Sequence, residues 1–322
     1  MGRCFVTRRL PGTALDRLAA AHEVEVWPLR LPPGPGELGS CLAGADGLLS
    51  LLTDPIGVAV LERAPGLRAI ANYAVGVDNI DVAEATRRGI PVGNTPDVLT
   101  ETSADFTFAL LMAAARRVVE ADAAARRDWV TWEPAALLGV DIHGATLGIV
   151  GRGRIGGAVA RRAEGFGMRV LHSERSAGEP LDELLAASDF VTLHCPLTAE
   201  TTGLIGAREL GLMRPGAVLV NTARGPIVDG DALATALSEG EIAAAALDVT
   251  DPEPPPPGHP LLSAPNLLLA PHIASASERT RAAMADCAVN NLLAALAGER
   301  MPHCVNPEVY EQSPPSATRR SP

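Results

Sequence analysis

Three residues that could do chemistry, Arg224, Glu253 and His272, each follow a short apolar run typical of a buried β-strand. The runs span residues 217–221, 244–249 and 267–270. In an α/β sheet the carboxyl ends of parallel strands form the edge where ligands bind, so we expect these side chains to lie close together. An arginine, a carboxylate and a histidine are the groups needed to reduce an α-keto acid.

Each residue has a distinct role in that chemistry. As hydride reaches the carbonyl carbon, His272 would donate a proton to the carbonyl oxygen. Glu253 would hydrogen-bond the other ring nitrogen and favour the protonated imidazole. Arg224 would bind the substrate carboxylate and polarise the carbonyl. Taken singly, the three could instead be a structural hydrogen-bonding histidine, a surface residue of the proline-rich loop and a helix-end charge.

A glycine-rich turn precedes this constellation in the chain. Residues 146–150 read as a strand and lead into a GxGxxG sequence followed by an amphipathic helix, which is the context that dinucleotide binding requires. Gly151 allows the tight turn, Gly153 lets the backbone approach a pyrophosphate, and Gly156 lets the helix pack on the strand. The free N–H groups of the helix N-terminus would then face the phosphates.

The next predicted strand ends near Glu174, which lies 23 residues after Gly151. A carboxylate at about this spacing accepts hydrogen bonds from the adenosine ribose and repels a 2′-phosphate, which favours NAD(H). Arg175 follows directly and could pair with that phosphate, so NADP(H) is the alternative. Both residues could also be solvated loop charges.

Composition excludes several other functions. The net charge of −11 argues against nucleic acid and anionic membranes. No apolar run approaches the roughly 18 residues of a membrane span, and the N-terminus lacks a signal-peptide core, so we expect a cytoplasmic protein. The sequence has no lysine, which excludes a pyridoxal Schiff base and a P-loop. Neither the five scattered cysteines nor any histidine pair has metal-ligand spacing, so we expect no metal.

The order of predicted elements indicates the α/β class, with two Rossmann-like or flavodoxin-like domains built on parallel sheets. Strand and helix patterns alternate up to about residue 94, a long helix spans 100–117, and a second α/β series follows. The helix at 279–297 is long enough to return to the first domain. We therefore expect a discontinuous substrate-binding domain of residues 1–98 plus 290–310, a dinucleotide-binding domain of residues 99–289, and a disordered tail at 311–322.

The residues described so far resemble the D-isomer-specific 2-hydroxyacid dehydrogenases, most closely the glyoxylate/hydroxypyruvate reductases. The resemblance covers most of the chain, from about Phe5 to Glu308. It rests on the combination of residues 5–9, 75–78, 94–100, the glycine turn, 221–225, 247–262 and 271–273.

This resemblance implies roles that the residues alone do not. Arg224, Glu253 and His272 would be the catalytic triad, and the backbone N–H groups of Val75 and Gly76 would bind the substrate carboxylate. Leu51 and Leu52 would shape the substrate pocket. The positions that would contact cofactor are Arg154, Ile155, Glu174, Thr222, Asp248 near the nicotinamide amide, and Ser103 near the pyrophosphate or nicotinamide. The family is usually homodimeric, and Trp132 would reach the partner's active site or pack in the dimer interface.

The expected function is NAD(P)H-dependent reduction of glyoxylate or hydroxypyruvate to the D-2-hydroxy acid, with hydride from nicotinamide and the proton from His272. One alternative is a dehydrogenase of another D-2-hydroxy acid, such as 3-phosphoglycerate. A phosphorylated substrate would need several arginines, and residues 50–54 and 74–79 contain none. The other alternative is a dinucleotide-sensing corepressor-like module, against which the acidic charge counts.

Overall fold

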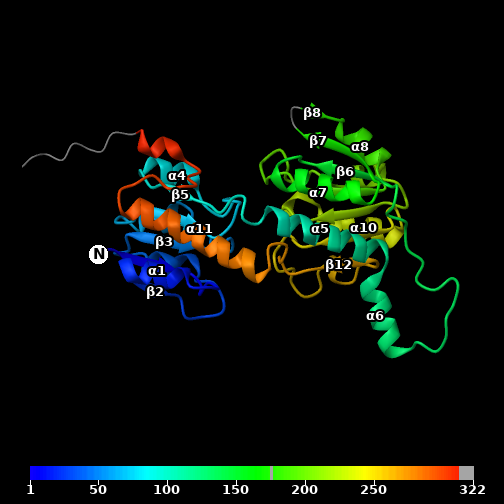
Figure 1. The fold of residues 1–322 in the computed structure, drawn as a ribbon, viewed down its shortest axis with the longest axis horizontal. Helices are drawn as coiled ribbons and strands as arrows, with labels where there is room; N and C mark the ends of the chain where they lie inside the picture. The colour runs from blue at the N-terminus through cyan, green and yellow to red at the C-terminus, as the bar shows by residue number, and fades with distance from the viewer. Residues whose placement is uncertain (175–176, 312–322) are drawn as a thin grey trace, which may run out of the picture. The chain divides into compact units, whose positions relative to one another are not determined.

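The computed structural model describes residues 1–174 and 177–311 and divides into two compact units (Figure 1). The first contains residues Met1–Leu99 and the chain from Ser277 onward, and the second is Thr100–Ala276. The return falls at Ser277, earlier than the expected residue 290. The reason is that one face of helix α11 (Glu278–Leu296) is buried from Thr280 onward and packs on the first unit's β3, β4 and α1. Most of the expected tail, 312–322, lies outside the described residues.

The first unit is built on a five-stranded parallel sheet with strand order β2-β1-β3-β4-β5, which is the flavodoxin-like order. The strands are β1 (Arg3–Val6), β2 (Glu23–Val26), β3 (Gly47–Ser50), β4 (Ala69–Asn72) and β5 (Val92–Gly93). The helices are α1 (Ala14–Ala21), α2 (Pro35–Cys41), α3 (Val58–Glu62), α4 (Val82–Arg87), α11 and the 3-10 helix η3 (Pro307–Tyr310).

The second unit has a seven-stranded sheet of order β12-β11-β10-β9-β6-β7-β8, parallel except for β8. Its strands are β6 (Thr146–Val150), β7 (Arg169–Glu174), β8 (Ala177–Gly178), β9 (Phe190–Leu193), β10 (Val218–Asn221), β11 (Ala244–Leu247) and β12 (Leu267–Leu269). From β6 the chain extends the sheet in one direction through β7 and then returns to place β9 on the other side of β6. The gap between β6 and β9 is therefore the topological switch point, where doubly wound sheets bind ligands.

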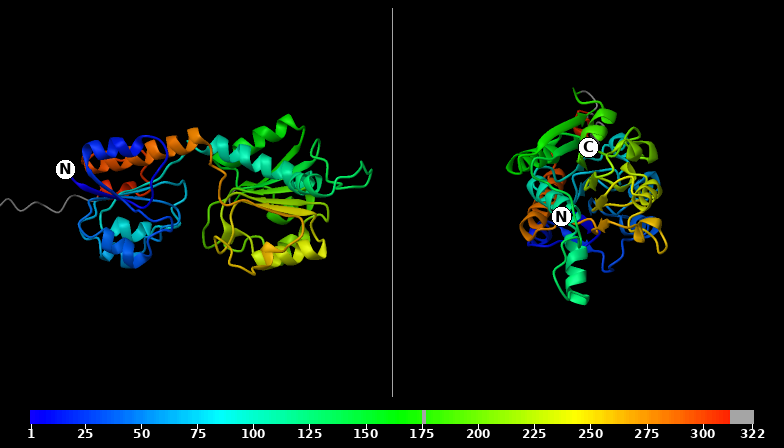
Figure 2. Two further views of the ribbon diagram at one scale, coloured as in Figure 1. Left: turned by 90° about the horizontal axis from the view of Figure 1, so that it is seen from below. Right: turned by 90° about the vertical axis from the view of Figure 1, so that its right-hand side faces the viewer.

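Helices cover both faces of this second sheet (Figure 2). Leucines of α8 (Leu181–Ala187), α9 (Ala207–Leu212) and α10 (Gly230–Glu239) join one buried cluster, while α5 (Thr100–Ala115) and α7 (Arg154–Gly165) join the other. Two 3-10 helices, η1 (Gly225–Ile227) and η2 (Pro260–Leu262), lie in loops. Every residue of β9, β10 and β11 is buried, which explains why these strands read as continuous apolar runs.

One helix and one strand of the second unit had no counterpart among the expected elements. Arg117 has a left-handed backbone (φ 52°), which ends the long helix and starts α6 (Val118–Arg127). Helix α6 projects from the body of the unit and buries none of its residues (Figures 1 and 2). Its two valines, Val118 and Val119, are exposed and do not pack on the unit. Strand β8 has only two residues, too few for a pattern.

Candidate active site

The glycine turn lies at the switch point, and glycine suits each of the three motif positions for a different structural reason. Gly151 has φ +92°, and a Cβ there would lie 2.6 Å from the Cys195 backbone nitrogen in the segment after β9. A Cβ on Gly156 would lie 2.1 Å from the Gly151 carbonyl oxygen, so only glycine lets α7 pack on the turn. A Cβ on Gly153 would meet nothing within 4 Å, which leaves that side open to a ligand.

Helix α7 begins directly after Gly153, and no side chain caps its N-terminus. Its first N–H groups are therefore suited to bind a phosphate. Arg152 and Arg154 are exposed beside this end, and Ile155 is half-buried.

His194, directly after β9, has a buried Nε2 with no hydrogen-bond partner among the described residues, and burial lowers its pKa to about 4. An unpartnered polar atom next to the turn, together with the open side of Gly153, fits a bound dinucleotide.

The other residues expected to contact cofactor lie on α5 and at strand ends. Glu174 is the exposed last residue of β7, while Arg175 lies outside the described residues. Thr222 follows β10, and its hydroxyl lies 2.9 Å from the Thr107 hydroxyl. Thr107 donates its proton to the Ser103 carbonyl (2.8 Å), so Thr222 must donate to Thr107. This chain of hydrogen bonds joins α5 to the carboxyl edge of the sheet.

Glu253 and His272 form a direct pair at that edge. His272 Nδ1 lies 2.7 Å from Glu253 Oε1, and the two side chains are 22% and 34% exposed. The pairing fixes the ring orientation and places Nε2 on the side opposite Glu253. His272 itself has a left-handed backbone, with φ 56°.

Arg224 lies in the loop after β10, one strand away from the loop that leads to Glu253. Its guanidinium Nη1 donates to the Ala223 carbonyl (2.8 Å). Buried Asn221, at the end of β10, holds this loop with two hydrogen bonds. Its Nδ2 donates to the Arg224 carbonyl (2.8 Å), and its Oδ1 accepts from the Ala223 N–H (3.0 Å). The three expected catalytic residues thus follow β10, β11 and β12, which are neighbours in the sheet.

Asp248 directly follows β11 and is 1% exposed. Its Oδ1 accepts the Ile273 N–H (2.7 Å), and its Oδ2 accepts the Ala274 N–H (2.8 Å). Burial raises the pKa of this carboxyl, while the two N–H donors and nearby His272 oppose the rise. Both oxygens thus contact the loop that carries His272.

The residues expected to bind substrate through their backbone lie in the first unit, after β4. The Asn94 Nδ2 donates to the Val75 carbonyl (2.8 Å), and the Asn72 Nδ2 donates to the Gly76 carbonyl (2.9 Å). These bonds fix the peptide planes of the turn. Leu51 and Leu52 follow β3 and are half-buried; Leu51 N–H donates to Asp54 Oδ2 (2.7 Å).

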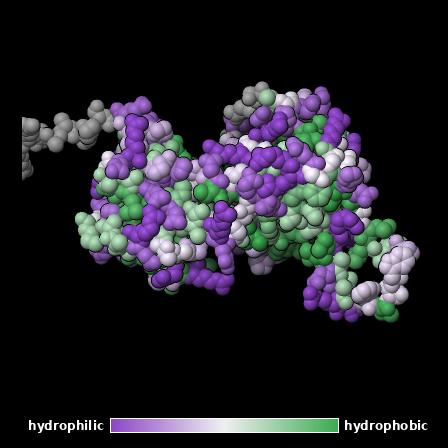
Figure 3. Space-filling model, viewed as in Figure 1, coloured by the Kyte–Doolittle hydropathy of each residue, from purple (hydrophilic) through white to green (hydrophobic). Residues whose placement is uncertain are grey.

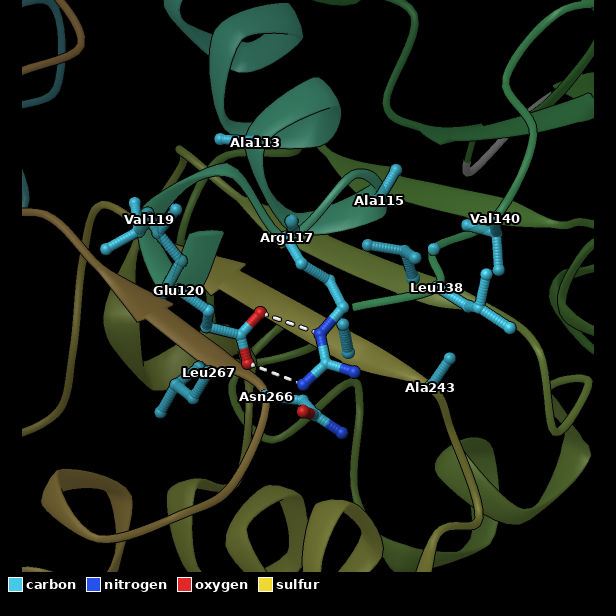
Figure 4. Close-up of a pocket in the computed structure, with 15 residues that line it drawn as sticks. Ala113, Ala115, Arg117, Val119, Glu120, Leu138, Val140, Ala243, Asn266 and Leu267 are labelled. Carbon is cyan, nitrogen blue, oxygen red and sulfur yellow. Dashed lines mark hydrogen bonds and ion pairs between the residues drawn. The ribbon is translucent and has the colours of Figure 1, made fainter. Parts of the chain in front are cut away.

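Trp132 lies in the segment after α6 and is 77% exposed. A cavity of about 370 Å³ is lined by the C-terminal end of α5, the first turn of α6 and residues 138–140 of that segment (Figure 4). It also touches the first residues of β10, β11 and β12, so it lies at the amino edge of the sheet, opposite His272. Two of its lining residues, Arg117 and Glu120, form an ion pair (2.9 Å).

The residues that hold these loops, chiefly Asn221, Asn72, Asn94 and Thr107, are not among those that the sequence pattern predicted to be functional. The available signal was weak: Asn72 and Asn221 each end an apolar strand, where a buried polar side chain needs partners. Among the described residues no group of three or more His, Cys, Asp or Glu side chains is arranged to hold a metal ion. No helix of the described chain combines the length and apolar character of a membrane span.

A glycine turn at a switch point and a histidine–glutamate pair on the same sheet edge characterise a dinucleotide-dependent oxidoreductase. Comparison with known families narrows this class. The profile of the D-isomer specific 2-hydroxyacid dehydrogenase NAD-binding domain matches residues 108–274, and the chain belongs to that family.

Several relatives match over almost the whole chain. A glyoxylate reductase of Korarchaeum cryptofilum is 53% identical over 326 residues, covering 97% of this chain and 98% of the relative. A crystal structure of a Thermus thermophilus protein superposes with a TM-score of 0.88 at 52% identity, covering 94% of this chain and 99% of that one. An NADPH-dependent glyoxylate/hydroxypyruvate reductase of Sinorhizobium meliloti, in complex with NADP and malonate, has a TM-score of 0.84 at 35% identity, covering 94% and 96%.

Proposed function

We propose that this protein reduces glyoxylate or hydroxypyruvate to the corresponding 2-hydroxy acid, the D isomer in the case of hydroxypyruvate, and that it works in the cytoplasm. The observation that carries the proposal is the 2.7 Å pair of Glu253 and His272, placed on the same sheet edge as the glycine turn. High identity to a glyoxylate reductase supports the choice of substrate. A bound reduced nicotinamide supplies the hydride for such a reduction.

The protein's own residues supply the proton and hold the substrate. His272 donates from Nε2 to the carbonyl oxygen, because Nδ1 is engaged by Glu253. The Glu253 carboxylate stabilises the protonated ring before transfer and keeps its orientation. Arg224 pairs with the substrate carboxylate and stabilises the charge that develops on the carbonyl oxygen.

In the first unit, we assign the N–H groups of Val75 and Gly76 to the substrate carboxylate. The bond from Asn94 to the Val75 carbonyl fixes the peptide plane that carries the Gly76 N–H. The Thr95 N–H donates to the Ala74 carbonyl at 2.9 Å and fixes the plane that carries the Val75 N–H. A pair of fixed N–H groups is a good anion site because it needs no reorganisation on binding. Leu51 and Leu52 would then line the apolar side of the pocket.

We propose NADH as the preferred cofactor, with NADPH the alternative. Gly151, Gly153 and Gly156 would admit the pyrophosphate, and Arg154 and Ile155 at the start of α7 would contact it. Thr222 and Ser103 would contact the nicotinamide half. The Glu174 carboxylate at the end of β7 would accept hydrogen bonds from the adenosine ribose and repel a 2′-phosphate.

Absorbance of reduced nicotinamide tests these proposals. The purified protein is mixed with glyoxylate, hydroxypyruvate, pyruvate or 3-phosphohydroxypyruvate and with NADH or NADPH; lack of oxidation with every keto acid refutes the enzyme function. His272→Ala should abolish turnover but bind dinucleotide normally. Glu174→Ala should increase the use of NADPH relative to NADH, and an unchanged ratio would show that Glu174 does not contact the ribose.

We also propose that the protein is a homodimer in which α6 and the following segment cover a second copy. Val130 is 93% and Trp132 77% exposed, with Trp129 and Leu138 also exposed nearby. Figure 3 shows hydrophobic surface on this projecting part and beside it. Exposed aromatic groups of this kind are typical of interfaces. Light scattering should give twice the chain mass, and Trp129→Ala with Trp132→Ala should weaken the dimer; a monomeric wild-type protein would refute the proposal.

A further inference from the structure

Three consecutive backbone N–H groups in the His272 loop donate to one residue, Asp248. The His272 N–H donates to the Asp248 carbonyl oxygen at 2.8 Å. The Ile273 and Ala274 N–H groups donate to Oδ1 and Oδ2 at 2.7 and 2.8 Å. Asp248 therefore contacts the loop with its main chain and with both oxygens of its side chain.

The His272 backbone needs such support. Its φ of 56° lies in the left-handed region, which a residue with a side chain adopts only at a cost. Unfavourable backbone conformations persist where the surroundings fix them. Here the following two peptide groups are fixed by the buried carboxylate, so the chain cannot relax at His272 without losing both hydrogen bonds.

We propose that Asp248 is a positioning residue, which holds His272 in its left-handed conformation and thereby within hydrogen-bond reach of Glu253. This inference rests on the proposed function. It is separate from a contact with the nicotinamide amide, for which each carboxylate oxygen keeps a further lone pair. A change at Asp248 should therefore loosen the His272 loop and reduce turnover even at saturating dinucleotide.

The test variant is Asp248→Asn. Its carboxamide offers one acceptor oxygen, and its NH₂ group would face a second N–H donor, so the loop loses at least one hydrogen bond. Asp251→Asn is the matched control, since it removes the same charge from the same loop at an exposed residue. Hydrogen–deuterium exchange of the Ile273 and Ala274 amides measures the loop independently of activity. Steady-state kinetics and NADH fluorescence titration measure the consequences.

We expect exchange at 273–274 to accelerate about 10-fold or more in Asp248→Asn. We expect kcat at saturating NADH to fall about 10- to 100-fold, because a misplaced acid costs rate steeply. Asp251→Asn should match wild type in all three measurements. If Asp248→Asn does not fold, Asp248→Glu, which keeps the charge but displaces it by one methylene, should show the same accelerated exchange.

Two results would overturn the proposal. One is unchanged exchange at 273–274 in the folded variant. The other is a large rise in the NADH Kd with exchange unaltered, which would make Asp248 a cofactor ligand. Failure of the proposed function is distinct: wild type would then reduce no keto acid, while the exchange measurement would still report whether Asp248 holds the loop.

Discussion

Gly225→Ala should lower both the catalytic rate and the free energy of unfolding, although the substitution adds only one methyl group. Gly225 follows Arg224 directly and packs against the chain that leads to Glu253. A Cβ at this position would lie 1.9 Å from the Thr250 carbonyl oxygen and 2.1 Å from its carbon. Both contacts are with backbone, so no side chain can turn aside to make room.

The required movement sets the magnitude of the effect. Ordinary contact begins at 3.4 Å, so the two loops must separate by about 1.5 Å, the difference between 3.4 and 1.9 Å. A shift of about 1 Å in a catalytic group can lower the rate about 100-fold, which corresponds to about 2.7 kcal/mol of transition-state stabilisation. Overpacking should also lower the free energy of unfolding by about 1–3 kcal/mol.

Gly216→Ala is the control, because a Cβ there meets nothing within 4 Å and the residue precedes the same strand, β10. Glyoxylate kinetics and urea unfolding should be measured for both variants. We expect kcat/KM to fall about 100-fold for Gly225→Ala and to stay within about twofold for Gly216→Ala. If Gly225→Ala keeps wild-type activity and stability, the close packing of these two loops does not position Arg224 and Glu253.

Two further predictions concern the switch point. Burial lowers the pKa of the His194 imidazole to about 4, from an ordinary value of 6.5. The unfolded chain therefore binds the proton at a higher pH than the folded protein. The free energy of unfolding should fall as pH drops below 6.5, by up to about 3 kcal/mol near pH 4. Urea unfolding of His194→Gln should show a smaller loss over this range, and equal losses in both proteins would contradict the assignment. Gly151→Ala should weaken NADH binding at least about tenfold in a fluorescence titration, because φ +92° and the 2.6 Å approach to Cys195 exclude a side chain. Gly165→Ala, in open space at the end of α7, should bind NADH like wild type; weakening in both would point to a general effect on the helix.

The sequence predicted the elements whose residues are buried on both faces. The runs that became β9, β10 and β11 are apolar except for Thr192 and the terminal Asn221, and the glycine turn follows the buried strand β6. The exact return of the chain was not predictable, because the periodicity of α11 shows that one face is buried but not which unit buries it. Helix α6 was not predicted, and it buries none of its residues.

The catalytic side chains could be named from sequence because their chemistry is specific, but the residues that hold them could not. Asn221 ends β10 and Asp248 directly follows the neighbouring strand β11, and the Asp248 N–H donates to the Asn221 carbonyl at 2.9 Å. From these adjacent positions one side chain holds the loop of Arg224 and the other holds the loop of His272. Both bonds are made to backbone, so they depend on the path of each loop, which a residue pattern does not encode.

Reactive groups must stay partly exposed to meet substrate, and exposed side chains on loops are poorly fixed by packing. In this protein the hydrogen bonds that hold the catalytic loops come from buried polar residues at the ends of the sheet strands, which the sheet immobilises. A buried amide or carboxylate is costly unless its partners are complete, and here the loop peptides complete them. The hydrogen bonds that satisfy the buried side chains of Asn221 and Asp248 are therefore the same bonds that hold the loops of Arg224 and His272 in place. A change that destabilises this edge of the sheet should for that reason also disturb the geometry of the site.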